Sequence, residues 1–214
     1  LLNFAFTQVA IKSTPKSIIH NLESNIPKIL MLEIDHQSFL LEDEIEQMDK
    51  SIPYRFGAPF EVNYNLNNSG QWTEIDEGRV WRLSIKSENA YSINLIYDKF
   101  ILPDGAEMFV YDENMETILG AFTSANNKEY QTFSTAPTKG NTTIIEYFEP
   151  YDVDFNGEIS ISSVIHAYRD IFFNETRGYG DSGSCNNNVN CSEFSDWSDE
   201  VRSVAMILTS GGSR

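Results

Sequence analysis

The chain has 214 residues, of which 41% are hydrophobic and 13% aromatic, enough to build one large packed domain or two small ones. Asp and Glu total 32 against 15 Lys and Arg, a net charge of −17, so the chain lacks the basic surface that nucleic acids require. No run approaches the roughly 18 apolar residues of a membrane span, and we expect no nucleic-acid partner and no membrane span.

The first residues, LLNFAFTQ, are typical of the end of a secretory signal peptide. An apolar stretch leads to small residues at Ala5 and Thr7, which would make Gln8 the mature start. The alternative is a buried first strand. We interpret residues 1–7 as a signal remnant on a secreted precursor.

A helix is predicted over about residues 39–50. Ser38 is a suitable N-cap, acidic residues occupy the first turns, and apolar residues recur at helical spacing from Leu40 to Met48. Pro53 follows the helix and prevents its continuation. The acidic run on this helix is predicted to be a solvated face: Glu42, Asp43, Glu44 and Glu46.

Short runs of alternating apolar and polar residues extend from residue 60 to about residue 168, separated by turn residues every 8 to 14 positions. The predicted strands are FEVNYNL, RVWRLSIKS, YSINLIYDKF, AEMFVYD, TILGAF, NTTIIEYFE and EISISSVI. This pattern predicts a mainly β fold, an antiparallel β-sandwich or jelly roll over about residues 56–168.

One predicted strand shows the expected burial most clearly. In RVWRLSIKS, the side chains of Trp81, Leu83 and Ile85 lie on one face, whereas Arg82, Ser84 and Lys86 lie on the other. We therefore expect the first set to be buried and the second to face solvent, as in a half-buried strand.

The segment DVDFNGEIS between two predicted strands permits two interpretations. Asp152, Asp154, Asn156 and Gly157 match the opening of a calcium loop, but the twelfth position is Ser163 instead of a bidentate Glu. Asn followed by Gly is equally typical of a tight hairpin turn. The hairpin is the favoured interpretation, and no metal site is predicted.

Residues 180–185 read GDSGSC, the form in which chymotrypsin-like peptidases present their nucleophilic serine. Ser182 would need a base, and the chain has only three histidines. We expect His166 to be a structural imidazole at the end of a strand and His36 to lie on the surface. His20 has no acidic neighbour at a spacing typical of a catalytic or metal site. Because no histidine is assigned as the base, we interpret Ser182 as part of a polar turn and not as a nucleophile.

Residues 174–200 are rich in Asn, Ser, Gly and Asp and are predicted to be a linker or exposed loop, followed by an apolar strand, VRSVAMIL. Cys185 and Cys191 fit an oxidising compartment, and their spacing matches no common zinc motif. From the residues alone, the two cysteines could bond to each other or to other partners.

The stretch GDSGSCNNNVNC, followed by WSDEVRSVAMIL, resembles the mature N-terminus of secreted bacterial lysyl-endopeptidase-like serine peptidases. The upstream segments RFGAPFEVN, VWRLSIKSENAYSINLIYDKFILPDGAEMFVYDEN and EISISSVIHAYRD resemble the propeptide of the same group. The resemblance extends from about residue 30 onward. It implies a propeptide over 8–177 and the start of a chymotrypsin-type barrel over 178–214.

The resemblance also implies site residues. Activation cleavage would follow Arg177 and leave Gly178 as the new N-terminus, with Gly180 as the alternative terminus. Cys185 and Cys191 would each pair with a cysteine farther downstream. The catalytic triad would also lie downstream, so this chain alone should be inactive, its partner should be its own peptidase domain, and no cofactor is implied.

A second function class fits the β pattern, namely a secreted β-sandwich module that binds carbohydrate or a surface partner. Its binding platform would consist of exposed aromatic side chains, for which Trp72, Trp81, Tyr91 and Tyr97 are the candidates. The alternation around Trp81 predicts that most of them are in the core instead.

Overall fold

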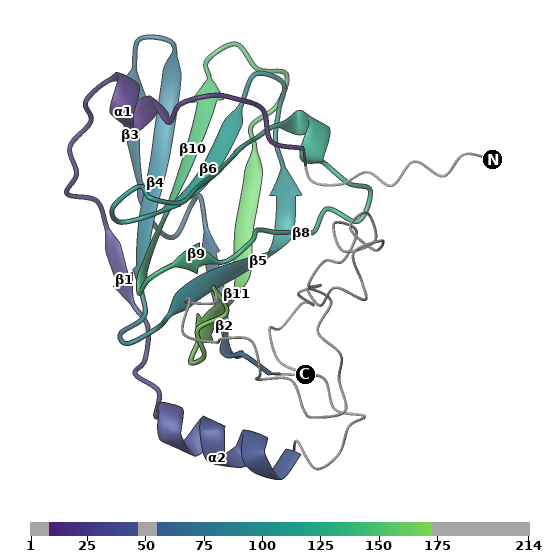
Figure 1. The fold of residues 1–214 in the computed structure, drawn as a ribbon. Coiled ribbons are helices and arrows are strands. Elements are labelled where there is room, and N and C mark those ends of the chain that lie inside the picture. Colours follow the sequence, from purple (N-terminus) through teal and green to yellow (C-terminus); the bar gives the residue numbers. More distant parts are fainter. Residues whose placement is uncertain (1–8, 47–54, 173–214) are drawn as a thin grey trace, which may run out of the picture.

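The computed structural model describes residues 9–46 and 55–172. Within them, two sheets pack face to face as a β-sandwich, with a helix beneath one end (Figure 1). The predicted mainly β fold is confirmed. No helix in the described ranges is both long and apolar enough to cross a membrane.

The first sheet contains six strands among the described residues, in the order β1-β4-β10-β6-β7, with β3 also paired to β4. Their bounds are β1 Lys28–Leu30, β3 Gln71–Ile75, β4 Gly78–Lys86, β6 Glu107–Asp112, β7 Ile118–Phe122 and β10 Thr142–Pro150. All pairings are antiparallel except that of β1 with β4. We call this sheet A.

The second sheet, sheet B, contains five strands among the described residues, in the order β2-β11-β5-β8, with β9 also paired to β5. Their bounds are β2 Gly57–Asn65, β5 Ser92–Ile101, β8 Phe133–Ser134, β9 Thr138–Lys139 and β11 Glu158–Ala167. The last long strand, β11, therefore lies inside the sheet, between β2 and β5.

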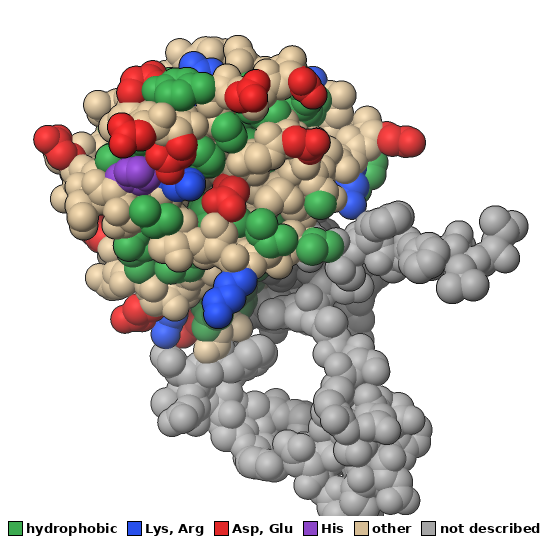
Figure 2. Space-filling model, turned by 90° about the horizontal axis from the view of Figure 1, so that it is seen from above, with side chains coloured by type: hydrophobic (Ala, Val, Ile, Leu, Met, Phe, Trp, Pro, Cys, Tyr) green, Lys and Arg blue, Asp and Glu red, His purple; other side chains and the backbone are tan. Residues whose placement is uncertain are grey.

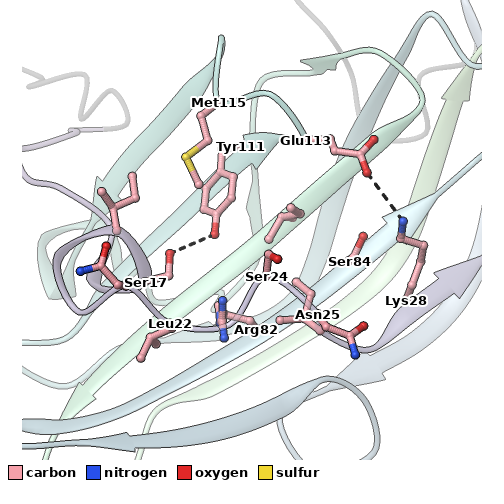
Figure 3. A pocket seen from close by; sticks show the side chains of 14 residues that line it. Ser17, Leu22, Ser24, Asn25, Lys28, Arg82, Ser84, Tyr111, Glu113 and Met115 are labelled. Carbon is pink, nitrogen blue, oxygen red and sulfur yellow. Dashed lines mark hydrogen bonds and ion pairs between the residues drawn. The ribbon is translucent and has the colours of Figure 1, made fainter.

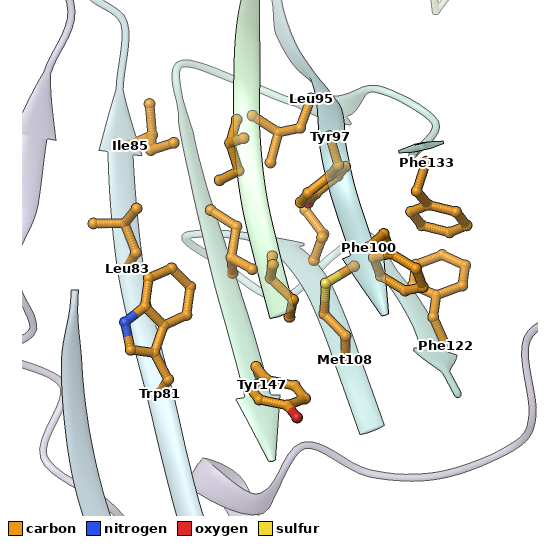
Figure 4. Packing of buried hydrophobic residues seen from close by; sticks show 14 of the residues in the cluster. Trp81, Leu83, Ile85, Leu95, Tyr97, Phe100, Met108, Phe122, Phe133 and Tyr147 are labelled. Carbon is orange, nitrogen blue, oxygen red and sulfur yellow. The ribbon is translucent and has the colours of Figure 1, made fainter. Parts of the chain in front are cut away.

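The core fills the space between the sheets with aliphatic and aromatic side chains (Figure 4). Trp81, Leu83 and Ile85 of β4 are all fully buried there, as the alternation predicted. The Trp81 indole donates a hydrogen bond to the Ser69 carbonyl oxygen at 2.8 Å. Gly70 has a φ of +68°, and a Cβ at this residue would lie 2.5 Å from the Trp81 ring, so the turn before β3 requires glycine.

The opposite face of β4 is also buried, which the sequence did not predict. Arg82 is 6% exposed and Ser84 is 2% exposed, because residues 9–27 cross the outer face of sheet A (Figure 1). This N-terminal segment is hydrogen-bonded to β7 through Ile11 and to β4 through Pro27. It includes the one-turn helix α1, Lys16–Ile19. A 3-10 turn, Ser124–Asn126, follows β7.

The longer helix, α2, spans His36–Glu46 and so begins three residues before the predicted start. Asp35 supplies the acceptors at its N-terminus, because its carboxylate accepts hydrogen bonds from the Gln37 amide at 3.0 Å and the Ser38 hydroxyl at 2.7 Å. Ser38 is therefore inside the helix and is not its N-cap. The predicted C-terminal part of the helix lies outside the described residues.

The segment DVDFNGEIS, interpreted from the sequence as a calcium loop or a hairpin turn, has a different role in the fold. Residues 151–157 join β10 of sheet A to β11 of sheet B, so the segment connects the two sheets and is not a hairpin. The Gly157 amide donates to Glu149 Oε2 at 2.6 Å. No group of three or more metal-ligating side chains occurs within 9–46 and 55–172.

Candidate functional site

The best-defined polar site surrounds the point where the chain leaves the sandwich after β11. Helix α2 lies beneath this end of the sandwich (Figure 1). Tyr168 and Arg169 directly follow β11, and their side chains meet residues of α2. Two adjacent networks of buried polar groups hold the helix and the end of the strand together.

The first network is centred on Asp43, which is 5% exposed. Its carboxylate accepts hydrogen bonds from Arg55 Nε at 2.8 Å, Arg169 Nη2 at 2.8 Å and the Tyr168 hydroxyl at 2.9 Å. We call these four residues the exit cluster. The Arg55 side chain also pairs with Glu42 at 3.0 Å. Asp43 was predicted to face solvent with the other acidic residues of the helix, and this prediction is wrong.

The electrostatics of the exit cluster favour a charged Asp43. Burial alone would raise the pKa of the Asp43 carboxyl, but hydrogen bonds from Arg169, Arg55 and Tyr168 outweigh it, so that the pKa lies below 3.8. Burial and the Asp43 carboxylate raise the pKa of the Tyr168 hydroxyl. The cluster therefore holds one buried anion between two arginines at neutral pH.

The second network joins two histidines that lie 130 positions apart in the sequence. His36 Nε2 lies 2.7 Å from His166 Nε2, so one nitrogen must donate and the other accept. His166 Nδ1 lies 2.7 Å from the Ser87 hydroxyl. We call His36 and His166 the histidine pair. His36 was predicted to be a surface residue, whereas its ring is half-buried against His166 and Tyr168.

The environment of His166 keeps its imidazole neutral. The side chain is fully buried, and burial, followed by the nearby His36, lowers its pKa from 6.5 to about 4. The hydrogen bond between Ser87 and His166 has the form of a nucleophile beside its base. However, Ser87 is also fully buried, so no substrate carbonyl can reach its hydroxyl. The arrangement is structural, as predicted for His166, and it connects α2 to β11.

His20, the third histidine, contacts Glu77 and is not part of the histidine pair. Its Nε2 is 3.0 Å from Glu77 Oε1, which also accepts from Lys16 Nζ at 3.2 Å. The hydrogen bond from His20 lowers the pKa of Glu77. This acidic partner is 57 positions away in the sequence, so local spacing could not reveal it.

The aromatic candidates for a carbohydrate platform do not form one surface. Trp81 and Tyr97 are fully buried, whereas Tyr91 is 49% exposed. Trp72 is half-buried, and the Arg79 guanidinium lies 4.2 Å from its ring centroid. Trp72 lines a groove, together with Arg79 and polar residues of neighbouring loops.

The remaining candidate residues lie outside the described ranges. They are the predicted cleavage residues Arg177, Gly178 and Gly180, the serine Ser182, and the cysteines Cys185 and Cys191. The signal remnant and the apolar strand VRSVAMIL also lie outside them.

Comparison with known proteins adds little to these observations. No protein-family model matches the chain. Among solved structures, a family 35 carbohydrate binding module from an environmental isolate is similar at 18% identity and a TM-score of 0.23, covering 54% of this chain and 88% of that chain. A superposition this loose carries no argument about function.

Proposed function

We propose that the β-sandwich is the propeptide of a secreted serine endopeptidase precursor, and that it assists folding of the peptidase and blocks its cleft until cleavage. The observation that supports this proposal is the position of the folded unit in the chain. Arg169 belongs to the exit cluster, the buried Ile171 follows two residues later, and the segment that resembles a peptidase N-terminus begins at Gly178, nine residues after Arg169.

The spacing suits a tethered folding assistant. The eight residues from Arg169 to Arg177 can span at most about 28 Å, so a peptidase domain that follows would remain close to the sandwich. A linked module acts at an effective concentration on the order of millimolar. Because Asp43 anchors Arg169, the position from which the tether starts is fixed relative to sheet B.

The charge of the sandwich is compatible with a protein partner. Figure 2 shows acidic side chains spread across the face seen from above, interspersed with basic and hydrophobic ones. The chain as a whole carries a net charge of −17. A more basic peptidase surface would be attracted to such a domain, and its association would weaken with added salt.

Two experiments test the proposal. Sequencing the gene beyond Arg214 should reveal further cysteines and the histidine, aspartate and serine of a triad. Purified residues 8–177, added to the matching mature peptidase, should raise its refolding yield or inhibit it, whereas an unrelated β-sandwich of similar charge should do neither. No change in yield or in activity would refute the proposed role.

A secreted binding module is the second candidate, and the groove at Trp72 is the observation that favours it. Asn65, Asn67 and Lys99 line this groove beside Trp72 and Arg79, and amides with an indole are suited to sugar hydroxyls and apolar ring faces. Saturable binding of a glycan that is lost in Trp72→Ala would support this candidate. A glycan array without a hit would count against it.

A further inference from the structure

A pocket of about 560 Å³ lies between the N-terminal segment and the outer face of sheet A (Figure 3). We call it the outer pocket. Its floor includes Arg82 and Ser84 of β4, Tyr111 of β6 and Ile144 of β10, and Ser17 belongs to the covering segment. The volume is within the range of small-molecule sites. The outer pocket is separate from the exit cluster and from the groove at Trp72.

The floor of the outer pocket contains two buried polar groups without protein partners. Arg82 is 6% exposed and Ser84 is 2% exposed. Arg82 Nε and the Ser84 hydroxyl have no hydrogen-bond partner among the described residues. Buried polar atoms almost always have a partner, and buried charges are normally paired. These two groups are therefore available to a ligand that enters the pocket.

The nearest candidate for an internal partner is already engaged. Glu146 lies directly opposite Arg82 in the register of β10 and β4. Its Oε1 accepts from the Ser17 amide at 2.9 Å, and its Oε2 accepts from the Tyr111 hydroxyl at 2.8 Å. No ion pair of the described residues includes Arg82. The carboxylate of Glu146 is thus held toward the N-terminal segment, and the Arg82 side chain lines the pocket as a buried group whose Nε has no partner among the described residues.

The rest of the lining indicates the chemistry of a ligand. Ile18, Leu22, Ile26 and Ile144 provide aliphatic walls, and Lys28 lies 3.7 Å from Glu113 at the edge of the pocket. A guanidinium presents a fork of N–H donors that matches a carboxylate. Because Glu146 adds a negative charge nearby, a monoanion suits this site better than a phosphate dianion.

We propose that the outer pocket binds an aliphatic carboxylate, with Arg82 and Ser84 donating hydrogen bonds to the carboxylate oxygens and the aliphatic walls contacting the hydrocarbon part. Two sources share this chemistry, a free short-chain acid and an acidic residue of a peptide. The proposal does not depend on the propeptide role, because it rests only on residues within the sandwich and its N-terminal segment.

Calorimetric titration of the 214-residue chain tests the proposal. The probes are isovalerate and the blocked peptide acetyl-Val-Glu-Val-amide, each with a neutral counterpart, isovaleramide and acetyl-Val-Gln-Val-amide. We expect at least one acid to bind about tenfold or more tightly than its amide, as loss of a charge-assisted hydrogen bond requires. Tighter binding of isovalerate would identify a free acid as the source, and tighter binding of the peptide would identify a peptide. Equal binding of acids and amides, or binding of neither acid at millimolar concentration, would overturn the proposal.

Variants locate the binding to the outer pocket. Arg82→Gln should weaken binding of the preferred acid by about tenfold or more, and Ser84→Ala should weaken it by a smaller factor. Lys86→Gln is the matched control, because Lys86 lies on the same strand and pairs with Glu88 at 2.8 Å. The Lys86→Gln variant should bind the preferred acid with the same affinity as the native chain. Unchanged affinity in Arg82→Gln would overturn the proposal, and if that variant does not fold, unchanged affinity in Ser84→Ala would do so.

Discussion

Acidification should destabilise the domain through His166. The pKa of this residue is about 4 in the folded chain against 6.5 as the ordinary value, so between these values the unfolded chain binds a proton that the folded chain does not. The free energy of unfolding therefore falls as the pH falls through this range. The contribution lost from this one residue is about 2 kcal/mol at pH 5 and about 3 kcal/mol at pH 4. Below about pH 4 the folded chain also takes up the proton, and this loss levels off.

Urea unfolding at a series of pH values from about 7 to about 4 measures this effect. His166→Gln removes the titrating group, so the variant should be less stable at neutral pH yet lose about 3 kcal/mol less than the native chain over the series. Asn67→Ser is the control, because Asn67 is exposed in the turn before β3 and carries no titratable group, and its curve should run parallel to the native one. Parallel curves for the native chain and His166→Gln would refute the reasoning.

Three substitutions test the remaining structure by urea unfolding. Asp43→Asn should lower the free energy of unfolding by about 3 to 5 kcal/mol, because it leaves two arginines without their shared carboxylate. The control Glu44→Gln, at an exposed neighbour on α2, should change the free energy of unfolding by less than about 0.5 kcal/mol. Equal effects of the two substitutions would contradict the stabilising role of the exit cluster. Gly157→Ala should cost about 1 to 3 kcal/mol, since a Cβ would lie 2.0 Å from the Tyr147 hydroxyl oxygen, and native stability would show that the loop adjusts freely. Trp81→Ala should cost about 3 to 5 kcal/mol through the cavity it leaves, and a smaller loss would mean that the sheets close over the space.

The long strands could be predicted from the sequence because their signal is local. Seven alternating runs bounded by turn residues correspond to β2, β4, β5, β6, β7, β10 and β11. The strands that were missed are β3, with five residues, β1, with three, and β8 and β9, with two each. Strands of two residues are too short to show an alternating pattern. Both β8 and β9 form by pairing with β5.

The burial of β4 could not be predicted because it depends on a distant segment. Alternation correctly placed Trp81 in the core, but it assigned Arg82 and Ser84 to solvent, since polar residues on the second face of a strand usually face water. The N-terminal segment, about 60 residues earlier in the chain, covers that face. The burial of Asp43 also depends on a distant residue, because its partner Arg169 is 126 positions away. Within the acidic run of α2, nothing local distinguishes Asp43 from its exposed neighbours.

The long-range polar contacts define the extent of the folded unit. The Ser17 amide binds Glu146, His36 binds His166, and Asp43 binds Tyr168, and each of these contacts joins residues more than 120 positions apart. In every pair one member is fully or almost fully buried in the sandwich, so removing the other would leave a buried polar group without its partner, at a cost of about 1 to 3 kcal/mol each.

Residues 9–46 are therefore part of the same unit as the sandwich, and a shorter domain that starts at residue 55 would lose all three contacts. Cleavage after Arg177 would leave every one of them intact, because this bond follows Arg169 by eight residues. A propeptide that must remain folded after its own removal requires a boundary of this kind, beyond the last anchored residue of the domain.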